Sequence, residues 1–360
     1  MKKEKEHLML QEILEQERVI RDIVKKYVDF NSGITYFEEF KHKLRELRKV
    51  DRVTFLGCGT SYHAAIYGNY IFEEFVDLPC EVEFADEFLR RKTVIETETM
   101  FIFFSQSGET TDIISAAKKA KESKCLIVGI TNNINSTLAH LADVAINTLA
   151  GKEDALAATK TFSSQLIILA LLAVYIGGLN RKPPTISKRA IEEIKVLPEK
   201  IKNIFSLQEN IKKIAEKYKY IEQLAVLGEK YHFPIALEGG LKIKETSYTH
   251  AEGFSAHEFL HGPKALIEKN FPVIFFAPND SVYQENKKII KDLQEKEASL
   301  ILIATKGNKD FKFKDILYIP ESLEIFNPIL SVIILQFFAY FLALEKRMDM
   351  DKPRNLSKFI

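Results

Sequence analysis

The chain has 360 residues, a formal net charge of +1, 46% hydrophobic residues and 28% charged residues. This is the composition of an ordinary soluble globular protein, and the length favours about two domains. The nearly balanced charge argues against a broad binding surface for nucleic acid or for a membrane. The basic stretch 41–49 also contains Glu46 and leucines, so we interpret it as a solvated helix face.

Disulfides, secretion and membrane insertion are not expected. The chain has an odd number of cysteines, namely Cys58, Cys80 and Cys125, and none of them forms a CxxC pair. This is typical of reduced thiols in a cytoplasmic protein. The charged start, MKKEKEH, lacks the apolar core of a secretion signal. The apolar run 166–176 is too short to span a bilayer, and polar residues interrupt a second run at 329–344. We therefore expect a cytoplasmic protein in which both runs are buried core helices.

The first half of the chain alternates strand-like and helix-like segments. An amphipathic helix is predicted at 8–28, and a charged helix at about 36–48. Strands are then predicted at 53–56, 82–84, 100–104, 126–130 and 144–146, with helices at 64–75, 111–121 and 159–176. This alternation predicts an α/β fold: a parallel β-sheet flanked by helices on both faces, in three αβα layers of the flavodoxin-like type.

The second half repeats the first with an offset of about 170 residues. The matching segments are 53–56 with 224–227, 102–104 with 272–276, 126–130 with 300–304, and 164–176 with 329–344. We therefore predict two tandem copies of one α/β subdomain, at 51–185 and 186–345, with Pro183 and Pro184 in the linker. A helical segment at 1–50 precedes the copies, and a tail at 346–360 follows them.

A polar turn follows the strand in FIFFSQSGETTD, residues 101–112. It offers hydroxyl and amide donors around Gly108, from Ser105, Gln106, Ser107 and Thr110. Because the next helix starts with unpaired N–H groups and a positive dipole end, the turn is suited to a phosphate. A serine-capped loop without a ligand explains the same residues. The matching turn of the second half, FFAPND, lacks the hydroxyls, so we predict one phosphate site per chain.

A glycine loop after the first strand is a second candidate for this site. It reads GCGTSY rather than GxGxxG, and its candidate binding residues are Gly59, Thr60 and Ser61. A single glycine loop is weak evidence for a phosphate or a nucleotide.

The segment 238–263 carries the densest polar sequence. A helix is predicted at 237–248, which places Lys242 and Glu245 on one face. A lysine beside a carboxylate keeps the carboxylate ionised and suits a general base, although a surface ion pair would give the same spacing.

His257 and His261 form an HExxH match, but a zinc site of this type is not expected. Such a site needs both histidines on one continuing helix, and Gly262 and Pro263 stop any helix directly after His261. We interpret His261 either as a mobile acid or base or as a histidine at a helix C-terminus. A lysine in the charged tail could likewise fold over a site, or the tail could be frayed.

Taken together, these motifs resemble the sugar isomerase (SIS) family, and within it the isomerase half of glucosamine-6-phosphate synthases. The matching stretches are LQEILEQ at 10–16, LGCGTSYHA at 56–64, SQSGETTD at 105–112, ATKTF at 158–162, ALEGGLKIKETSYTHAE at 236–252, HGPKALI at 261–267 and DKPRNLSK at 351–358. They follow one another in order over nearly the whole chain. The resemblance implies two SIS subdomains and an enzyme acting on a sugar phosphate.

The resemblance also implies roles for individual residues. Ser61 and the donors of the 105–110 turn would hold the phosphate, and Glu245 would move a proton between C1 and C2 of the sugar. His261 would open the sugar ring, reaching in from a neighbouring subunit of a homo-oligomer, expected to be a dimer. Lys358 would meet the open-chain carbonyl, and Lys242 would lie near the amino end of the sugar. No metal or redox cofactor is implied.

Two departures from the family pattern affect the expected activity. The glutaminase half that supplies ammonia in the synthases is not found before residue 10, so we expect no hydrolysis of glutamine by this chain. In addition, the synthases usually carry a serine at the position of Ala158. The stretch LAATK is instead similar to that of stand-alone SIS-type glucosamine-6-phosphate deaminases.

The sequence therefore predicts a glucosamine-6-phosphate deaminase that forms fructose 6-phosphate and ammonia by aldose–ketose isomerisation. Three alternatives stay open. The chain could be the isomerase half of a synthase that uses a glutaminase partner or free ammonia, or a deglycase of fructosamine 6-phosphates. It could also be a sugar-phosphate sensor, although a sensor has no need of Glu245, His261 and Lys358 together.

Overall fold

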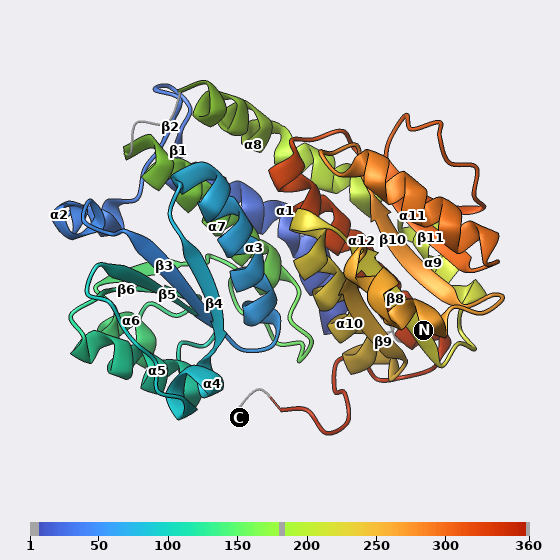
Figure 1. Ribbon diagram of the computed structural model, residues 1–360, viewed down its shortest axis with the longest axis horizontal. Coiled ribbons are helices and arrows are strands. Elements are labelled where there is room, and N and C mark those ends of the chain that lie inside the picture. Colours follow the sequence, from blue (N-terminus) through green and yellow to red (C-terminus); the bar gives the residue numbers. More distant parts are fainter. Residues whose placement is uncertain (1–6, 180–183, 358–360) are drawn as a thin grey trace, which may run out of the picture. The chain divides into compact units, whose positions relative to one another are not determined.

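The computed structural model describes residues 7–179 and 184–357, which form two compact units (Figure 1). The amino-terminal unit contains residues 18–153, 160–179, 184–196 and 357. The carboxyl-terminal unit contains residues 7–17, 154–159 and 197–356. Each unit is built on a five-stranded sheet. Pro183 lies outside the described residues, whereas Pro184 is the first residue of helix α8, a position that tolerates proline.

All strands of the amino-terminal sheet are parallel, in the order β4-β3-β5-β6-β7. Every residue of β5 is buried, as expected for a strand covered on both faces. The bounds are β3 Arg52–Gly57, β4 Cys80–Phe84, β5 Thr99–Ser105, β6 Leu126–Thr131 and β7 Val144–Asn147. The structure thus confirms the predicted parallel sheet.

Helices cover both faces of this sheet. On one face α3 (Thr60–Val76) packs against α7 (Lys160–Leu179), and the Phe72 ring of α3 contacts Phe55 of β3. Successive side chains of a strand point to opposite faces of the sheet. Those on the other face, such as Phe103, form a core with α4 (Ala85–Arg90), α5 (Thr111–Glu122) and α6 (Thr137–Leu141). The three-layer αβα arrangement is therefore confirmed.

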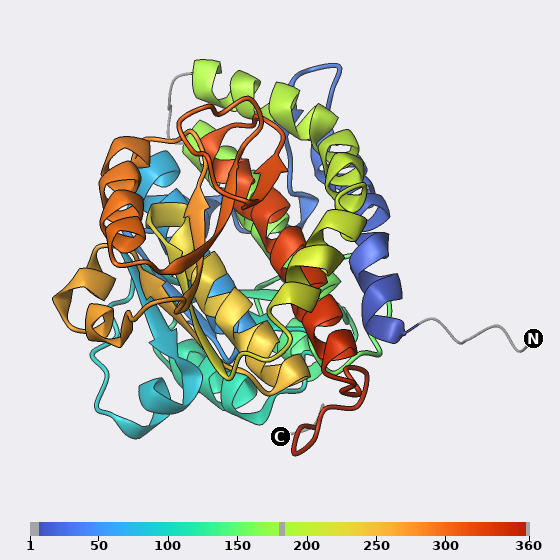
Figure 2. The ribbon, with the colours of Figure 1, turned by 90° about the vertical axis from the view of Figure 1, so that its right-hand side faces the viewer.

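The carboxyl-terminal sheet has the same topology, β9-β8-β10-β11-β12, again all parallel. Its strands are β8 Gln223–Gly228, β9 His250–Ser255, β10 Pro272–Ala277, β11 Ser299–Thr305 and β12 Asp315–Ile319. Helix α10 (Phe233–Ser247) lies beside α12 (Asn327–Glu345), as Figures 1 and 2 show, and α12 also contacts α9 (Gln208–Lys217). Helix α11 (Tyr283–Glu295) packs on a separate core with Phe275. The shared strand order confirms the predicted duplication.

The remaining elements are short or connect the two units in sequence. They are α1 Leu8–Tyr27, β1 Val28–Asp29, β2 Ile34–Thr35, η1 Glu38–Phe40, α2 Leu44–Leu47, α8 Pro184–Phe205, η2 Lys230–His232, η3 Glu258–His261, η4 Pro263–Leu266 and η5 Glu324–Phe326. The helix predicted at 8–28 is thus confirmed as α1.

The charged helix predicted at 36–48 is wrong. The segment forms only a 3₁₀ turn and one short helix, η1 and α2. Phe37 and Phe40 pack individually against the Tyr175 ring of α7, with centroid distances of 5.4 and 6.1 Å. These tertiary contacts decide the backbone there, because helical spacing of apolar residues is only a weak local preference.

Two helices are long and apolar enough to cross a membrane by composition alone, namely 160–179 and 324–345. Within each helix, an apolar window of 18 residues is 83% buried in the first and 100% buried in the second. Both are therefore core helices, as the sequence predicted.

Candidate functional site

Two loops of the amino-terminal unit flank a topological switch point. From β3 the chain passes to β4 on one side and then to β5 on the other side of β3. In open parallel sheets, ligands bind where the order reverses in this way, outside the carboxyl ends of the strands. The loops 57–61 and 105–110 leave β3 and β5 at this edge. Together they carry all predicted substrate-binding residues except Ala158.

Internal hydrogen bonds hold the turn after β5 in shape. Ser105 Oγ lies 2.8 Å from Thr110 Oγ1 and accepts the Gly108 N–H at 3.0 Å. Ser107 Oγ accepts the Glu109 N–H at 3.1 Å. Thr110 is the N-cap residue of α5, but its side chain makes no capping hydrogen bond. The first N–H groups of α5 thus receive no cap from the Thr110 side chain, and uncapped groups of this kind can bind an anion.

Glycine is required at two positions of these loops. Gly108 has a φ of +70°, and a Cβ there would lie 1.9 Å from Ser136 Oγ. A Cβ on Gly57 would lie 2.6 Å from the carbonyl oxygen of Ser61. The backbone thus turns tightly after β3, and Gly59 and Thr60 place Ser61 in the first turn of α3.

A residue that the sequence did not predict completes this group. Gln165 of α7 is fully buried, and its Nε2 donates to Ser61 Oγ at 3.0 Å. Its Oε1 accepts no hydrogen bond from the described part of the chain. In the sequence, Gln165 is marked only as the last polar residue before the apolar run 166–176.

In the carboxyl-terminal unit, a side chain of the protein fills the corresponding loop. Glu324 accepts the N–H of Ser281 at 3.3 Å and the Ser281 hydroxyl at 2.7 Å, and Lys230 Nζ lies 3.0 Å from Glu324 Oε1. Burial and the neighbouring Glu324 raise the pKa of Asp280 to about 7. This internal carboxylate takes the donors that an anion would use, which favours a phosphate site in the amino-terminal unit alone.

A buried lysine joins two carboxylates on α10. Lys242 Nζ lies 2.5 Å from Glu245 Oε2 and 3.4 Å from Glu238 Oε1. The side chains of Lys242 and Glu238 are 1% and 0% exposed, whereas that of Glu245 is 19% exposed. The interpretation of Lys242 and Glu245 as a surface ion pair is therefore wrong. Glu238 was not predicted, although its i,i+4 spacing to Lys242 is visible in the sequence.

The two neighbouring carboxylates keep Lys242 in its charged, protonated form. Burial alone lowers the pKa of a lysine, but the charges of Glu238 and Glu245 outweigh it and raise the pKa of Lys242 above its ordinary value. Glu245 thus has a permanent cation beside it, and it is the most exposed of the three groups. A reachable carboxylate of this kind suits a general base.

His261 ends η3, directly before Gly262 with a φ of +148°. The predicted helix stop at this point is confirmed. The 3₁₀ geometry of η3 does not give the α-helical i,i+4 pair that an HExxH site needs, and His257 Nδ1 lies 3.2 Å from Glu229 Oε2. His261 is exposed, and its side chain makes no hydrogen bond to the other described residues.

Two predicted site residues remain, Ala158 and Lys358. Ala158 is half-buried in the irregular segment before α7. Lys358 lies outside the described residues. The chain before it is anchored in the carboxyl-terminal unit, where Asp351 accepts the N–H groups of Leu8 and Met9 and the Arg354 guanidinium lies 4.1 Å from the centroid of the Tyr248 ring.

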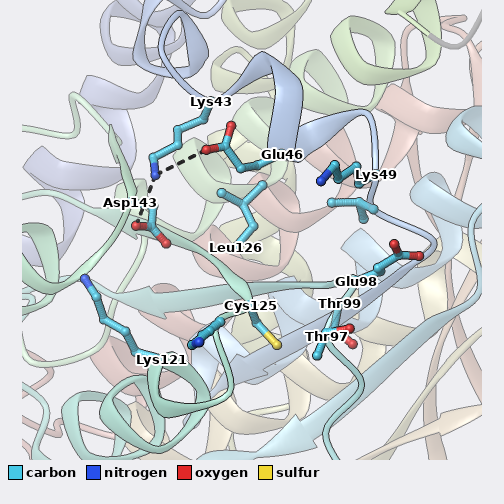
Figure 3. Close-up of a pocket in the computed structure, with 12 residues that line it drawn as sticks. Lys43, Glu46, Lys49, Thr97, Glu98, Thr99, Lys121, Cys125, Leu126 and Asp143 are labelled. Carbon is cyan, nitrogen blue, oxygen red and sulfur yellow. Dashed lines mark ion pairs between the residues drawn. The ribbon is translucent and has the colours of Figure 1, made fainter.

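A hollow of about 460 Å³ lies elsewhere, at the amino ends of β5 and β6 (Figure 3). Its Lys43 lies between Glu46 and Asp143, at 3.9 and 3.5 Å, and Lys121 donates to the carbonyl of Leu141. The hollow is at the opposite edge of the sheet from the 105–110 turn, and two of its lysines are already paired. We therefore do not assign it to the sugar phosphate.

Residues 46–175 and 219–346 each match the family described as SIS domain, and these stretches contain the two repeated sheets. The chain belongs to the SIS domain family. Its two SIS domains agree with the resemblance noted in the sequence.

Individual SIS relatives are similar over nearly the whole chain. A glutamine–fructose-6-phosphate aminotransferase (isomerizing) from Chlorobaculum tepidum is 37% identical over 99% of this chain, which covers 58% of that relative. The chain thus spans less than two thirds of this relative. The C-terminal domain of a glucosamine-fructose-6-phosphate aminotransferase from Francisella tularensis is 31% identical to this chain, with a TM-score of 0.92. The match covers 98% of this chain and 100% of that domain. A glucosamine-6-phosphate deaminase from Thermotoga maritima is 26% identical, with a TM-score of 0.76 and coverage of 98% and 99%.

Proposed function

We propose that this SIS protein interconverts fructose 6-phosphate plus ammonia and glucosamine 6-phosphate by moving a proton between C1 and C2 of the open-chain sugar. The observation that carries this proposal is the partly exposed carboxylate of Glu245, held against the buried Lys242. The names of the similar proteins support the same substrate class.

Formation of the amino sugar is the proposed main direction. The sequence favoured deamination because of the stretch around Ala158. The similarity to proteins named aminotransferases is stronger, with 37% identity to one relative and a TM-score of 0.92 to another, against 26% and 0.76 for the deaminase. Deamination is the same reaction in reverse and is therefore the second candidate. The ammonia would be free or delivered by a glutamine-hydrolysing protein.

The phosphate is assigned to the turn after β5. Ser105, Ser107 and Thr110 supply hydroxyl groups, and the uncapped N-terminus of α5 supplies N–H groups. Gln106 and Ser61 add further donors of the same unit. These groups fix the sugar by its charged end and take no part in the proton transfer.

Glu245 is proposed to carry the proton. Ammonia condenses with the C2 carbonyl of fructose 6-phosphate and water leaves, which gives an imine. Glu245 then takes a proton from C1 and returns it to C2, while the hydroxyl proton on C1 passes to the imine nitrogen, so that C1 becomes the aldehyde carbon and C2 carries the amine. Glu245 is a carboxylate before and after this transfer, and in that form it lies 2.5 Å from the ammonium group of Lys242.

The other two assigned groups act before this transfer. His261 is proposed to move the proton that opens the sugar ring, and its exposure suits a group that works from a neighbouring subunit of a homodimer. Lys358 is proposed to contact the open-chain carbonyl. Both roles rest on the family resemblance.

A product assay distinguishes this function from its rivals. The purified chain is incubated with fructose 6-phosphate and ammonia, and in parallel with glucosamine 6-phosphate or a fructosamine 6-phosphate. The proposal expects amino sugar to form from fructose 6-phosphate and ammonia, and ammonia to be released from glucosamine 6-phosphate. Turnover of the fructosamine 6-phosphate alone would instead identify a deglycase, and binding of the sugars without any turnover would identify a sensor.

A further inference from the structure

Gln165 is unusual among the polar residues at the start of α7. The hydroxyl of Thr161 donates to Glu153 at 2.8 Å, and that of Ser164 donates to the carbonyl of Lys160 at 2.6 Å. The Gln165 amide has one hydrogen bond, to Ser61, and its Oε1 has no partner in the described chain although the residue is 0% exposed. Whichever way the amide is turned, one of its ends is buried without a partner.

The duplicated domain provides a comparison. Gln336 of α12, the helix that matches α7 in the other unit, is also 0% exposed. Its Oε1 accepts from Gln16 Nε2 at 2.7 Å, and its own Nε2 donates to the carbonyl of Thr159 at 3.2 Å. Both ends of that amide are used within the fold. A glutamine buried in a core helix of this fold can therefore be fully satisfied, and Gln165 is not.

A buried amide with one unused end makes a fold less stable than an apolar side chain of similar volume would. The packing around Gln165 therefore does not explain a glutamine. Its one partner, Ser61, lies in the first turn of α3 at the switch point of the sheet, where the phosphate is assigned.

We propose that Gln165 is a positioning residue that orients the Ser61 hydroxyl towards the phosphate of the substrate. A hydroxyl has one proton and two acceptor sites. When Gln165 Nε2 donates to Ser61 Oγ, it occupies an acceptor site, and the Ser61 proton points away from α7. A hydrogen bond received by the hydroxyl also strengthens the one that it donates. This inference rests on the proposed phosphate site.

The inference predicts that removing the Gln165 amide does not destabilise the fold but weakens the binding of phosphate. In Gln165→Leu, the thermal midpoint without ligand should equal or exceed that of the wild type, because a buried unpaired amide end is removed. The dissociation constant for inorganic phosphate, measured by calorimetry, should rise about tenfold, as expected for the weakening of one hydrogen bond to a charged group. Gln165→Met, an unbranched side chain, serves as a second variant should the leucine disturb the packing.

A double-mutant cycle with Ser61→Ala separates positioning from a general structural effect. If Gln165 acts through Ser61, the leucine variant should weaken phosphate binding in the wild type and have no further effect on Ser61→Ala. Gln336→Leu is the matched control, which should lower the thermal midpoint and leave the dissociation constant unchanged.

Three results would overturn the inference: unchanged phosphate binding in both Gln165 variants, an equal loss in both Ser61 backgrounds, or a loss of binding that follows a lowered thermal midpoint. Failure of the proposed site itself would look different. In that case the wild type would not bind phosphate, or Ser61→Ala would bind it as tightly as the wild type.

Discussion

Lys242 Nζ lies 2.5 Å from Glu245 Oε2, on adjacent turns of α10, and the same ammonium group is shared with the fully buried Glu238. One cation therefore serves two carboxylates that differ in access. Glu238 has no exposed surface, so the substrate can reach Glu245 but not Glu238. Under the proposed function, this asymmetry favours Glu245 as the base and Glu238 in a supporting role.

Replacing the proposed base should remove turnover without removing binding. Glu245→Gln keeps the size and polarity of the side chain but cannot accept a proton. We expect the turnover number to fall at least about a hundredfold, with little change in the dissociation constant for fructose 6-phosphate. Glu252→Gln, an exposed position on β9, is the control and should retain full activity. Comparable activity of the Glu245 variant and the wild type would remove Glu245 from the mechanism.

Removing the shared cation should destabilise the protein. In Lys242→Met the buried carboxylate of Glu238 loses the ammonium group beside it, which we expect to lower the free energy of unfolding by about 3–5 kcal/mol. Urea unfolding at pH 7 measures this change. The double variant Lys242→Met, Glu238→Gln should recover much of the loss, because the buried charge is gone. If the double variant were no more stable than the single one, the assigned role of Glu238 would be wrong.

The turn at 105–110 should tolerate no side chain at Gly108. A Cβ there would lie 1.9 Å from Ser136 Oγ, so Gly108→Ala should displace the turn and raise the KM for the sugar phosphate about tenfold or more. Gly151→Ala is the matched control, because Gly151 has a similar φ of +69° and no atom within 4 Å of its Cβ position. It carries the same backbone strain without the clash and should keep a normal KM.

Because the pKa of Asp280 is raised, we predict that replacing Asp280 by asparagine stabilises the protein at high pH but not at low pH. Its folded-state pKa of about 7 exceeds the ordinary value of 3.8, because the group is buried and lies beside Glu324. The stability that Asp280 contributes is therefore present below pH 3.8 and is lost as the pH rises towards 7. Asp280→Asn should be more stable than the wild type at pH 8, by roughly 2–4 kcal/mol, and the gain should disappear near pH 4.

Urea unfolding at several pH values checks this prediction. Asp310→Asn is the control, because hydrogen bonds from Lys287 and Tyr283 hold the pKa of Asp310 below its ordinary value. It should show no gain at pH 8. A gain for Asp280→Asn that is the same at pH 4 and pH 8 would disprove the assigned titration.

The regular elements and the duplication could be predicted from the sequence because both leave local patterns. Buried parallel strands such as β5 are short apolar runs, and the second copy repeats them. The segment 36–48 could not be predicted in this way, because the packing of Phe37 and Phe40 on Tyr175 overrides the local pattern.

The candidate site was predictable where its residues are adjacent in sequence. Ser105, Thr110, Lys242 and Glu245 lie in short motifs, and the structure shows the bonds within each motif. The contact between Gln165 and Ser61 joins positions 104 residues apart, and that between Glu324 and Ser281 joins positions 43 residues apart. No local pattern marks such pairs, so only the fold could reveal them.

The central claim is that this chain moves a proton between neighbouring carbons of a phosphorylated sugar. This claim can be tested without knowing the nitrogen source of the reaction. Fructose 6-phosphate is incubated with the purified protein in D₂O, and proton NMR follows the C1 hydrogens. The account predicts that deuterium enters at C1 with the wild type and not with Glu245→Gln. If the wild type binds fructose 6-phosphate and no deuterium enters, with and without ammonia, the chain does not catalyse this transfer and the account is wrong.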